Sequence, residues 1–314
     1  MMWFWFSLIT LRCWSGSDLF SKIGCRDASD KYAHLKMVMA VGVVMGLHAA
    51  YEVFVNGVYI SWEVILTYLP VSLLYILSMA LGYMGLRYIE LSISSPICNA
   101  SGALVAILAI ITGGETYPPL VLVAIALVCV GVVGLGVVEA REDDELRAAR
   151  QEVGNFKYTK SWLALALPIA YCLLDAAGTF ADSVVLGEIE GIVAAASATS
   201  DYEASANVAY ELTFLAAGIF SAVWALVVKK DKLVLRMEAP KYVGAVFETA
   251  GQFAYIYAIA DEEHLAMSAP IISAYCAASV LWSRIFLKEK LSKKHYLCVL
   301  LVMAGIVILG ILDI

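Results

Sequence analysis

Long apolar runs alternate with short polar segments along almost the whole chain. Ten runs have the length of about 20 residues that an α-helix needs to cross the hydrocarbon core of a bilayer. They cover residues of about 1–23, 36–57, 63–86, 93–112, 119–138, 161–185, 206–228, 241–260, 266–286 and 295–313. The pattern predicts an all-α polytopic membrane protein with ten transmembrane helices. The first run is the weakest of the ten, because Arg12 and Asp18 interrupt it.

The basic residues are confined to alternate loops. Of the 21 Lys and Arg residues, 20 lie in the segments after the first, third, fifth, seventh and ninth runs, and the segments after the even-numbered runs hold none. Loops rich in Lys and Arg stay on the cytoplasmic side of a membrane. We therefore expect a multi-pass protein of the cell inner (plasma) membrane, with cytoplasmic basic loops and both termini outside.

The composition excludes several classes of soluble protein. The 314 residues are 62% hydrophobic and only 16% charged, whereas ordinary soluble domains are about 25% charged. A cytosolic enzyme or a secreted disulfide scaffold is therefore not expected. The net charge of −7 argues against a nucleic-acid partner. The cysteines form no CxxC pair and the histidines are scattered, so we predict no metal and no cofactor.

The chain matches itself without gaps when it is shifted so that Tyr83 meets Tyr257 and Gly136 meets Gly310. Between Tyr83 and Gly136, 15 of the 54 positions are identical to their partners in the second copy. The identical pairs include a proline, two glycines and a glutamate: Pro96 with Pro270, Gly131 with Gly305, Gly136 with Gly310, and Glu115 with Glu289. Each copy holds five helices, an odd number, so the copies must face opposite ways. We expect two inverted five-helix repeats, at residues 1–138 and 161–314, joined by a cytoplasmic linker at 139–160.

The motifs of the second copy resemble a known transporter family. Ser268-Ala-Pro-Ile, Lys288-Glu-Lys-Leu-Ser and a last helix with Gly305 and Gly310 are similar to the EamA type of the drug/metabolite transporter superfamily. Trp14-Ser-Gly in the first run resembles the family's Trp-Gly entry motif. The resemblance implies ten helices around a central cavity, and alternating access without nucleotide hydrolysis. It implies no particular substrate.

Ionisable residues within the apolar runs are the first candidates for a binding site. A charged side chain costs about 2.5–3.5 kcal/mol at the centre of an inserted helix, and lining a cavity is the usual reason for its presence. Asp18 and Asp175 lie in the matching first helices of the two repeats, and Asp175 is the best single candidate. Its alternative role is a structural ion pair with Arg12. Asp182 is expected near the outer surface, as an exposed helix end.

Further candidates are predicted to bind substrate or a coupling proton. Two sets each share one helix face: Glu52, His48 and Tyr51, and Glu248, Gln252 and Tyr255. The aromatic residues Trp14, Tyr83, Tyr255 and Tyr257 are expected to wall the cavity, and the repeat-related pair Asn99 and Ser273 is expected to line it. Glu211 is a further ionisable residue within a run. Acid-plus-aromatic faces suit a cationic substrate through charge attraction and cation–π contact. The tyrosines could instead anchor or pack the helices, and Asn99 and Ser273 could instead join helices by hydrogen bonds.

We therefore predict a secondary transporter, not an enzyme, for a small polar or amphiphilic metabolite, with a cationic or amine-bearing one favoured. Its partners would be the substrate, the lipid bilayer, and protons or another coupling ion. The alternative is a membrane scaffold that transports nothing. A lipid-modifying enzyme is less favoured, because no reactive cluster is visible in the sequence.

Overall fold

The computed structural model describes residues 2–27, 29–88, 91–113, 117–140, 162–196, 201–287 and 292–312. Within these ranges the elements are α-helices with two short η segments. They are α1 (Met2–Cys25), α2 (Ala33–Phe54), α3 (Trp62–Tyr88), α4 (Leu91–Cys98), α5 (Ser101–Gly113), α6 (Pro119–Ala140), α8 (Trp162–Ala196), α9 (Tyr202–Ala222), η1 (Val223–Val228), α10 (Leu235–Ile259), η2 (Glu262–His264), α11 (Leu265–Ser273), α12 (Tyr275–Phe286) and α13 (Lys293–Leu312). No strand occurs among the described residues.

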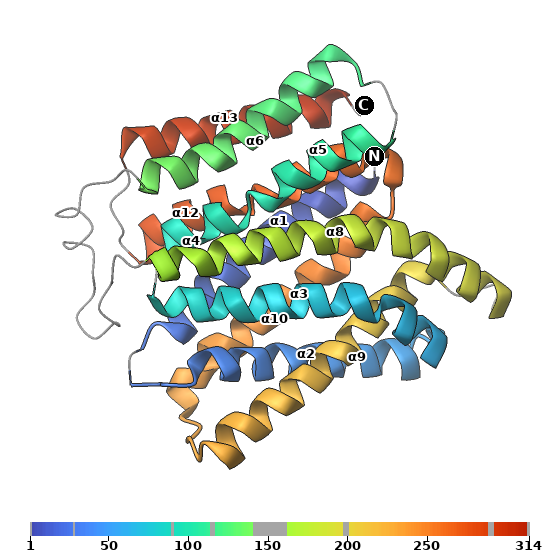
Figure 1. Cartoon of the computed structure of the whole chain (residues 1–314), viewed down its shortest axis with the longest axis vertical. Helices are drawn as coiled ribbons and strands as arrows, with labels where there is room; N and C mark the ends of the chain where they lie inside the picture. The colour runs from blue at the N-terminus through green and yellow to red at the C-terminus, as the bar shows by residue number, and fades with distance from the viewer. Residues whose placement is uncertain are drawn as a thin grey trace.

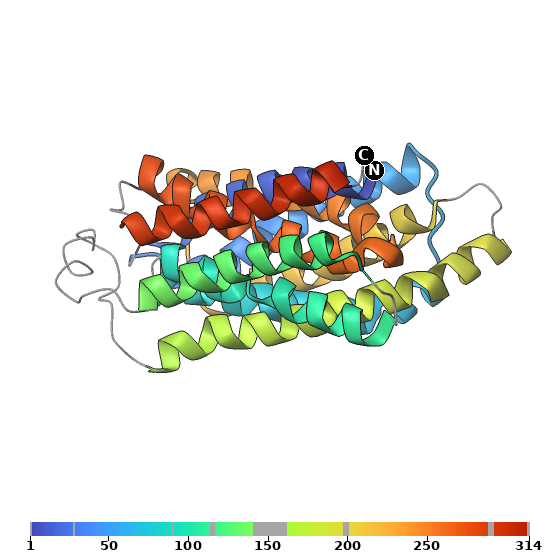
Figure 2. The ribbon, with the colours of Figure 1, turned by 90° about the horizontal axis from the view of Figure 1, so that it is seen from above.

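The helices run roughly along one common axis, and helices from the two halves of the chain pair with each other (Figure 1). The largest interfaces join α1 to α10, α3 to α8, α2 to α9 and α6 to α13. The α2–α9 pair and the α6–α13 pair form opposite edges of the bundle, and the other helices lie between them. Both chain ends lie at one end of the bundle, as Figure 2 also shows. Each of the two clusters of buried apolar side chains contains residues from both halves of the chain.

Two predicted spans are each built from two helices with a break near a proline. Pro96 lies in α4, which ends at Cys98, and Pro270 lies in α11, which ends at Ser273. Proline lacks an amide hydrogen and its ring clashes with the carbonyl one turn back, so helices kink or break near it. The next helices begin at Ser101 and Tyr275, which are partner positions in the sequence repeat.

The α6–α13 pair meets through two glycines with matching surroundings. A Cβ atom on Gly131 would lie 2.6 Å from Val302 Cγ2, and a Cβ atom on Gly305 would lie 2.6 Å from Val128 Cγ2. The repeat pairs the two glycines with each other, and it pairs the two valines in the same way. Only glycine permits this close approach of the two helices, so this interface depends on both positions.

The apolar helices have the character of membrane spans. Six described segments are long and apolar enough to cross a membrane: Ala33–Phe54, Trp62–Tyr88, Ser94–Thr112, Ala166–Ala196, Tyr202–Val228 and Leu265–Phe286. Large apolar side chains such as Leu47, Leu73 and Leu300 are more than half exposed on the outside of the bundle. Such a surface suits contact with lipid chains.

The sixth span is longer than the sequence indicated. We expected it to end near residue 185, but α8 continues to Ala196. The Asp201 side chain then accepts hydrogen bonds from the backbone amides of Glu203 and Ala204 and so caps the start of α9. Residues 141–160 of the expected linker, the Glu115–Glu289 pair and residues 288–291 of the Lys288 motif lie outside the described residues.

Candidate functional site

A cavity lies between the two halves, with walls from α1, α3, α4, α5, α8, α9, α10, α11 and α12. Its space open to the centres of water molecules measures about 80 Å³, and one water needs about 10–15 Å³ on this measure. The cavity in this conformation therefore has room for a few waters or one small solute. Nine of the predicted site residues line it: Trp14, Asp18, Tyr83, Asn99, Asp175, Glu248, Gln252, Tyr255 and Ser273.

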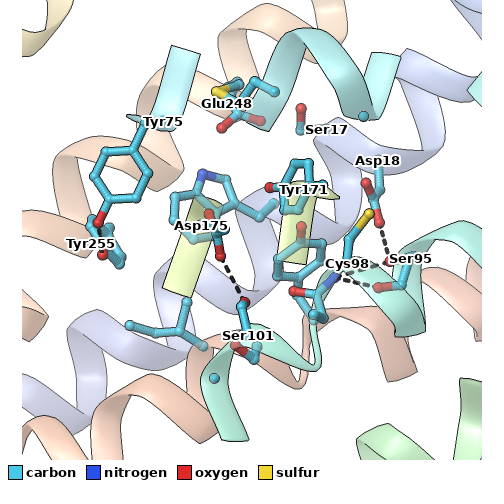
Figure 3. Close-up of a pocket in the computed structure, with 18 of the residues that line it drawn as sticks. Ser17, Asp18, Tyr75, Ser95, Cys98, Ser101, Tyr171, Asp175, Glu248 and Tyr255 are labelled. Atoms are coloured by element: carbon cyan, nitrogen blue, oxygen red, sulfur yellow. Dashed lines mark hydrogen bonds between the residues drawn. The ribbon is translucent and has the colours of Figure 1, made fainter. Parts of the chain in front are cut away.

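Three carboxyl groups face this cavity (Figure 3). The Ser101 hydroxyl donates to Asp175 Oδ2 at 2.7 Å, from the start of α5. The Glu248 carboxyl lies beside the Ser17 hydroxyl on α1. None of the described residues that line the cavity is Lys, Arg or His. The cavity therefore presents acidic groups without a basic partner.

The Asp18 carboxyl is held by both halves of the chain. Its Oδ2 atom accepts hydrogen bonds from Ser95 Oγ at 2.5 Å and from Ser279 Oγ at 2.8 Å. The Asn99 side-chain amide in turn donates to the backbone carbonyl of Ser95 at 2.8 Å. Asn99 thus borders the cavity and bonds back to Ser95 at the end of α4, a contact within one span and not between helices.

Aromatic side chains wall the cavity. The ring of Trp14 lies 5.0 Å from the ring of Tyr255 and 5.8 Å from the ring of Tyr275, measured between centroids. The buried Trp14 Nε1, Tyr83 hydroxyl and Gln252 Nε2 atoms have no hydrogen-bond partner among the described residues. Buried polar atoms are nearly always paired, so each of these three atoms has an unmet hydrogen bond in this conformation.

Two aromatic residues in the first helices of the two halves sit against glycines. A Cβ atom on Gly251 of α10 would lie 2.4 Å from Trp14 Cδ1, and a Cβ atom on Gly82 of α3 would lie 2.9 Å from Tyr171 Cδ2. Both distances are too short for any larger residue without movement of the ring. Because glycine has no side chain, these two positions leave the space that the rings of Trp14 and Tyr171 occupy.

Tyr171 is a cavity residue that the sequence analysis missed. The interval from Trp14 to Tyr171 in the sequence equals the interval from Asp18 to Asp175. The same aromatic-x-x-x-Asp pattern thus occurs in α1 and α8, and this spacing could have identified it. Tyr75 and Tyr275 also line the cavity, but no local sequence pattern distinguishes them from tyrosines that only pack.

Four predicted site residues lie away from this cavity. The His48 Nδ1 atom is 2.8 Å from Glu211 Oε1, and its Nε2 atom is 3.5 Å from Glu52 Oε1, at the interface of α2 with α9. Tyr51 is exposed on α2. The Tyr257 hydroxyl donates to Asp201 Oδ2 at 2.7 Å, so Tyr257 does not wall the cavity as expected. His48, Glu52 and Tyr51 thus lie on α2, at its interface with α9 or on the bundle surface, whereas Tyr257 of α10 stacks on Phe6 of α1.

Two further expectations need correction. Asp182 is not an exposed helix end, because α8 continues well beyond it and its carboxyl is fully buried. Arg12 is exposed on α1, while the Asp175 carboxyl accepts from Ser101. The alternative of an Asp175–Arg12 ion pair is therefore not seen.

Comparison with known proteins bears on this arrangement. Residues 191–311 match the model of the EamA-like transporter family. This segment is EamA-like. The predicted resemblance to the EamA type of the drug/metabolite transporter superfamily is thus confirmed, and the apolar helices together with this match make the chain a multi-pass membrane protein. The EamA-like segment contributes Glu248, Gln252, Tyr255 and Ser273 to the cavity.

The fold also occurs among solved structures. One, titled "Crystal structure of protein", shares 13% sequence identity with this chain and superposes with a TM-score of 0.63, over 98% of this chain and 96% of that chain. At this identity the likeness concerns the fold alone. No curated protein matches the chain. The family's description is of transporters, in agreement with the prediction that the chain is not an enzyme.

Proposed function

We propose that this protein is a secondary transporter that carries a small cationic or amine-bearing metabolite by alternating access around the central cavity. The observation that carries the proposal is the acidic lining without a base: Asp18, Asp175 and Glu248 face one small space. Carboxylates buried in a membrane protein are costly, and a bound cation would offset this cost by charge attraction. The EamA-like segment supports transport as the activity.

The unpartnered donors refine the substrate class. A cation alone would satisfy the carboxylates and leave the Trp14 Nε1 and Gln252 Nε2 hydrogens unused. A solute with a hydrogen-bond acceptor beside its ammonium group would use both kinds of partner. The rings of Trp14 and Tyr255, 5.0 Å apart, add cation–π attraction for the ammonium group. We therefore favour an amine that also carries a hydroxyl, carbonyl or carboxylate oxygen.

Alternating access would follow from two inverted five-helix halves. Three observations support this arrangement: the internal sequence repeat, the helix breaks at partner positions of that repeat, and the matching surroundings of Gly131 and Gly305. The pairing of α1 with α10 also mirrors the pairing of α8 with α3. Rocking of one half against the other would expose the cavity to each side in turn. The basic loops would face the cytoplasm of the cell inner membrane.

The first experiment is a thermal-shift screen of the purified protein with amines, amino acids, sugars and nucleosides. A ligand at 100 times its Kd stabilises the folded state by about 2.7 kcal/mol, so true ligands stand out. We expect stabilisation by amines that carry a nearby oxygen acceptor, and a smaller effect or none from uncharged isosteres. Uptake of the stabilising amines into proteoliposomes then tests transport. Stabilisation by sugars or nucleosides alone would contradict the proposed substrate class.

The alternative of a non-transporting scaffold makes the opposite prediction. A scaffold needs a packed centre, whereas this protein has a cavity lined by Asp175 and two further acids. Absence of uptake for every stabilising ligand would favour the scaffold.

A further inference from the structure

A second carboxyl group of α8 lies behind the wall of the cavity. Asp182 is seven residues, or about two helical turns and 10 Å, from Asp175 along α8. Its side chain has no exposed surface and it does not line the cavity. Nothing in the proposed binding of an amine uses this group.

The surroundings of Asp182 contain hydroxyl groups and no cation. The Tyr68 hydroxyl donates to Oδ1 at 2.7 Å, and the Tyr75 hydroxyl lies 3.2 Å from Oδ2. The phenols of Tyr210 and Tyr255 also lie close enough to interact electrostatically with Asp182. Among the described residues, no basic side chain is bonded to Asp182. An isolated buried carboxylate costs far more than a neutral carboxylic acid, so a proton is the ligand that this site can accept.

A chain of hydroxyl groups connects Asp182 to the cavity. The Tyr75 and Tyr255 hydroxyl oxygens are 2.5 Å apart, and the Tyr255 hydroxyl donates to Thr179 Oγ1 at 3.1 Å. Tyr75, Tyr255 and Thr179 all line the cavity (Figure 3 labels both tyrosines). Each separation is within the reach of proton transfer between hydrogen-bonded groups, which is about 2.6–3.2 Å or shorter.

We propose that Asp182 is a proton-binding site that exchanges its proton with the cavity through Tyr75 and Tyr255. In the protonated state the acid donates from Oδ2 to the Tyr75 oxygen, Tyr75 donates to Tyr255, and Tyr255 donates to Thr179. On release, each hydroxyl passes one proton to the next oxygen, the last proton leaves into the cavity, and the carboxylate then accepts from Tyr75. Every phenol is neutral before and after the transfer.

The consequence for transport rests on the proposed function. A proton held two turns from Asp175 changes the charge beside the substrate site, so Asp182 would supply the coupling proton. Intramembrane acids of this kind often form proton relays. The binding of the proton itself does not depend on any substrate.

Infrared difference spectroscopy of the purified protein in lipid nanodiscs tests the site without a ligand. We expect a C=O stretching band of a protonated carboxylic acid that changes with pH and is lost in Asp182→Asn. Asp182→Glu keeps an acid at this position and should keep a band at a shifted frequency. This variant shows that loss of the band in Asp182→Asn reports the loss of the acid and not a folding defect. A pH-dependent band that is unchanged in Asp182→Asn, or a carboxylate signal for Asp182 across the physiological pH range, would overturn the proposal.

The relay is tested by transfer of the sample into D₂O, which shifts the same band as the acid exchanges its proton. We expect Tyr75→Phe to slow this shift, because it removes the hydroxyl that bonds to both Asp182 and Tyr255. The matched control is Tyr68→Phe, which also removes one bond to Asp182 but leaves the relay intact; it should alter the frequency and leave the exchange rate unchanged. Equal exchange rates in the two variants would refute the relay. If the band behaves as expected while proteoliposomes move no solute, the proposed function fails and the proton site stands.

Discussion

The ion network at the end of the bundle where α2 and α10 begin gives the sharpest prediction of stability. Lys241 Nζ lies 2.9 Å from Asp30 Oδ2 and 3.2 Å from Glu238 Oε2, and Lys36 Nζ lies 2.9 Å from Asp30 Oδ1 and 3.0 Å from Asp231 Oδ2. Asp231 is 28% exposed, and the side chains of the other four residues are at most 6% exposed: Lys241, Asp30, Glu238 and Lys36. Asp30 and Lys36 belong to the first half, and the other three residues belong to the second. The network therefore joins the two halves.

We predict that Lys241→Met lowers the free energy of unfolding by about 3 kcal/mol. Removal of one partner from a buried ion pair costs about 3–5 kcal/mol, because the other charge is left buried without compensation. The lower end applies here, since Lys36 still pairs with Asp30 and lies 3.6 Å from Glu238 Oε1. The buried Glu238 oxygens accept no hydrogen bond among the described residues, so Glu238 depends on these two lysines for its charge balance.

The assay is equilibrium unfolding by SDS in mixed micelles, followed by tryptophan fluorescence. The matched control is Lys232→Met, since the Lys232 side chain is exposed on the neighbouring loop; it should change stability by no more than about 0.5 kcal/mol. The double variant Lys241→Met with Glu238→Gln restores the net charge of the network and should recover more than half of the loss. A loss below about 1 kcal/mol for Lys241→Met, or no recovery in the double variant, would refute the reasoning.

Two further predictions follow from other helix pairs. Gly131→Ala and Gly305→Ala should each destabilise the protein by about 1–3 kcal/mol, the usual cost of overpacking. The two losses should be similar, because both new methyl groups meet a valine at 2.6 Å. Unfolding by SDS measures both losses, and a large difference between them would argue against equivalent positions. His48→Ala should lower the free energy of unfolding by about 1–3 kcal/mol, because it leaves the fully buried Glu211 carboxyl without its closest partner. The double variant His48→Ala with Glu211→Gln should restore stability. If the two substitutions instead lower stability additively, the assigned contact is contradicted.

The acids of the cavity could be predicted from the sequence because a charge within an apolar run is itself a strong signal. The sequence does not reveal which face of each helix meets the cavity. His48 and Glu52 do share a face of α2, as their spacing predicts, but that face meets Glu211 on α9 and not the cavity. Periodicity identifies residues that point the same way, while the rotation of the helix within the bundle is set by tertiary packing.

Other errors had more local causes. Tyr255 and Tyr257 are two residues apart, so their side chains point about 200° apart around α10, and both could not face the same cavity. The position of Asp182 was misjudged because the end of the apolar run was taken as the end of the helix. The polar residues Glu188 and Glu190 interrupt the run, but α8 continues through them to Ala196. The loss of apolar character marks the expected membrane boundary and does not end the helix.

The central claim is that the acids of the cavity bind a cationic solute that the protein moves across the membrane. The most direct measurement is uptake into proteoliposomes of the amine that stabilises the protein best, beside its uncharged isostere. We predict uptake of the amine alone, and at least about a tenfold loss, or about 1.4 kcal/mol, in Asp175→Asn. The control variant Asp27→Asn, at an exposed loop acid that bonds to Ser29, should transport normally. Equal uptake of the isostere, or full uptake by Asp175→Asn, would contradict the claim.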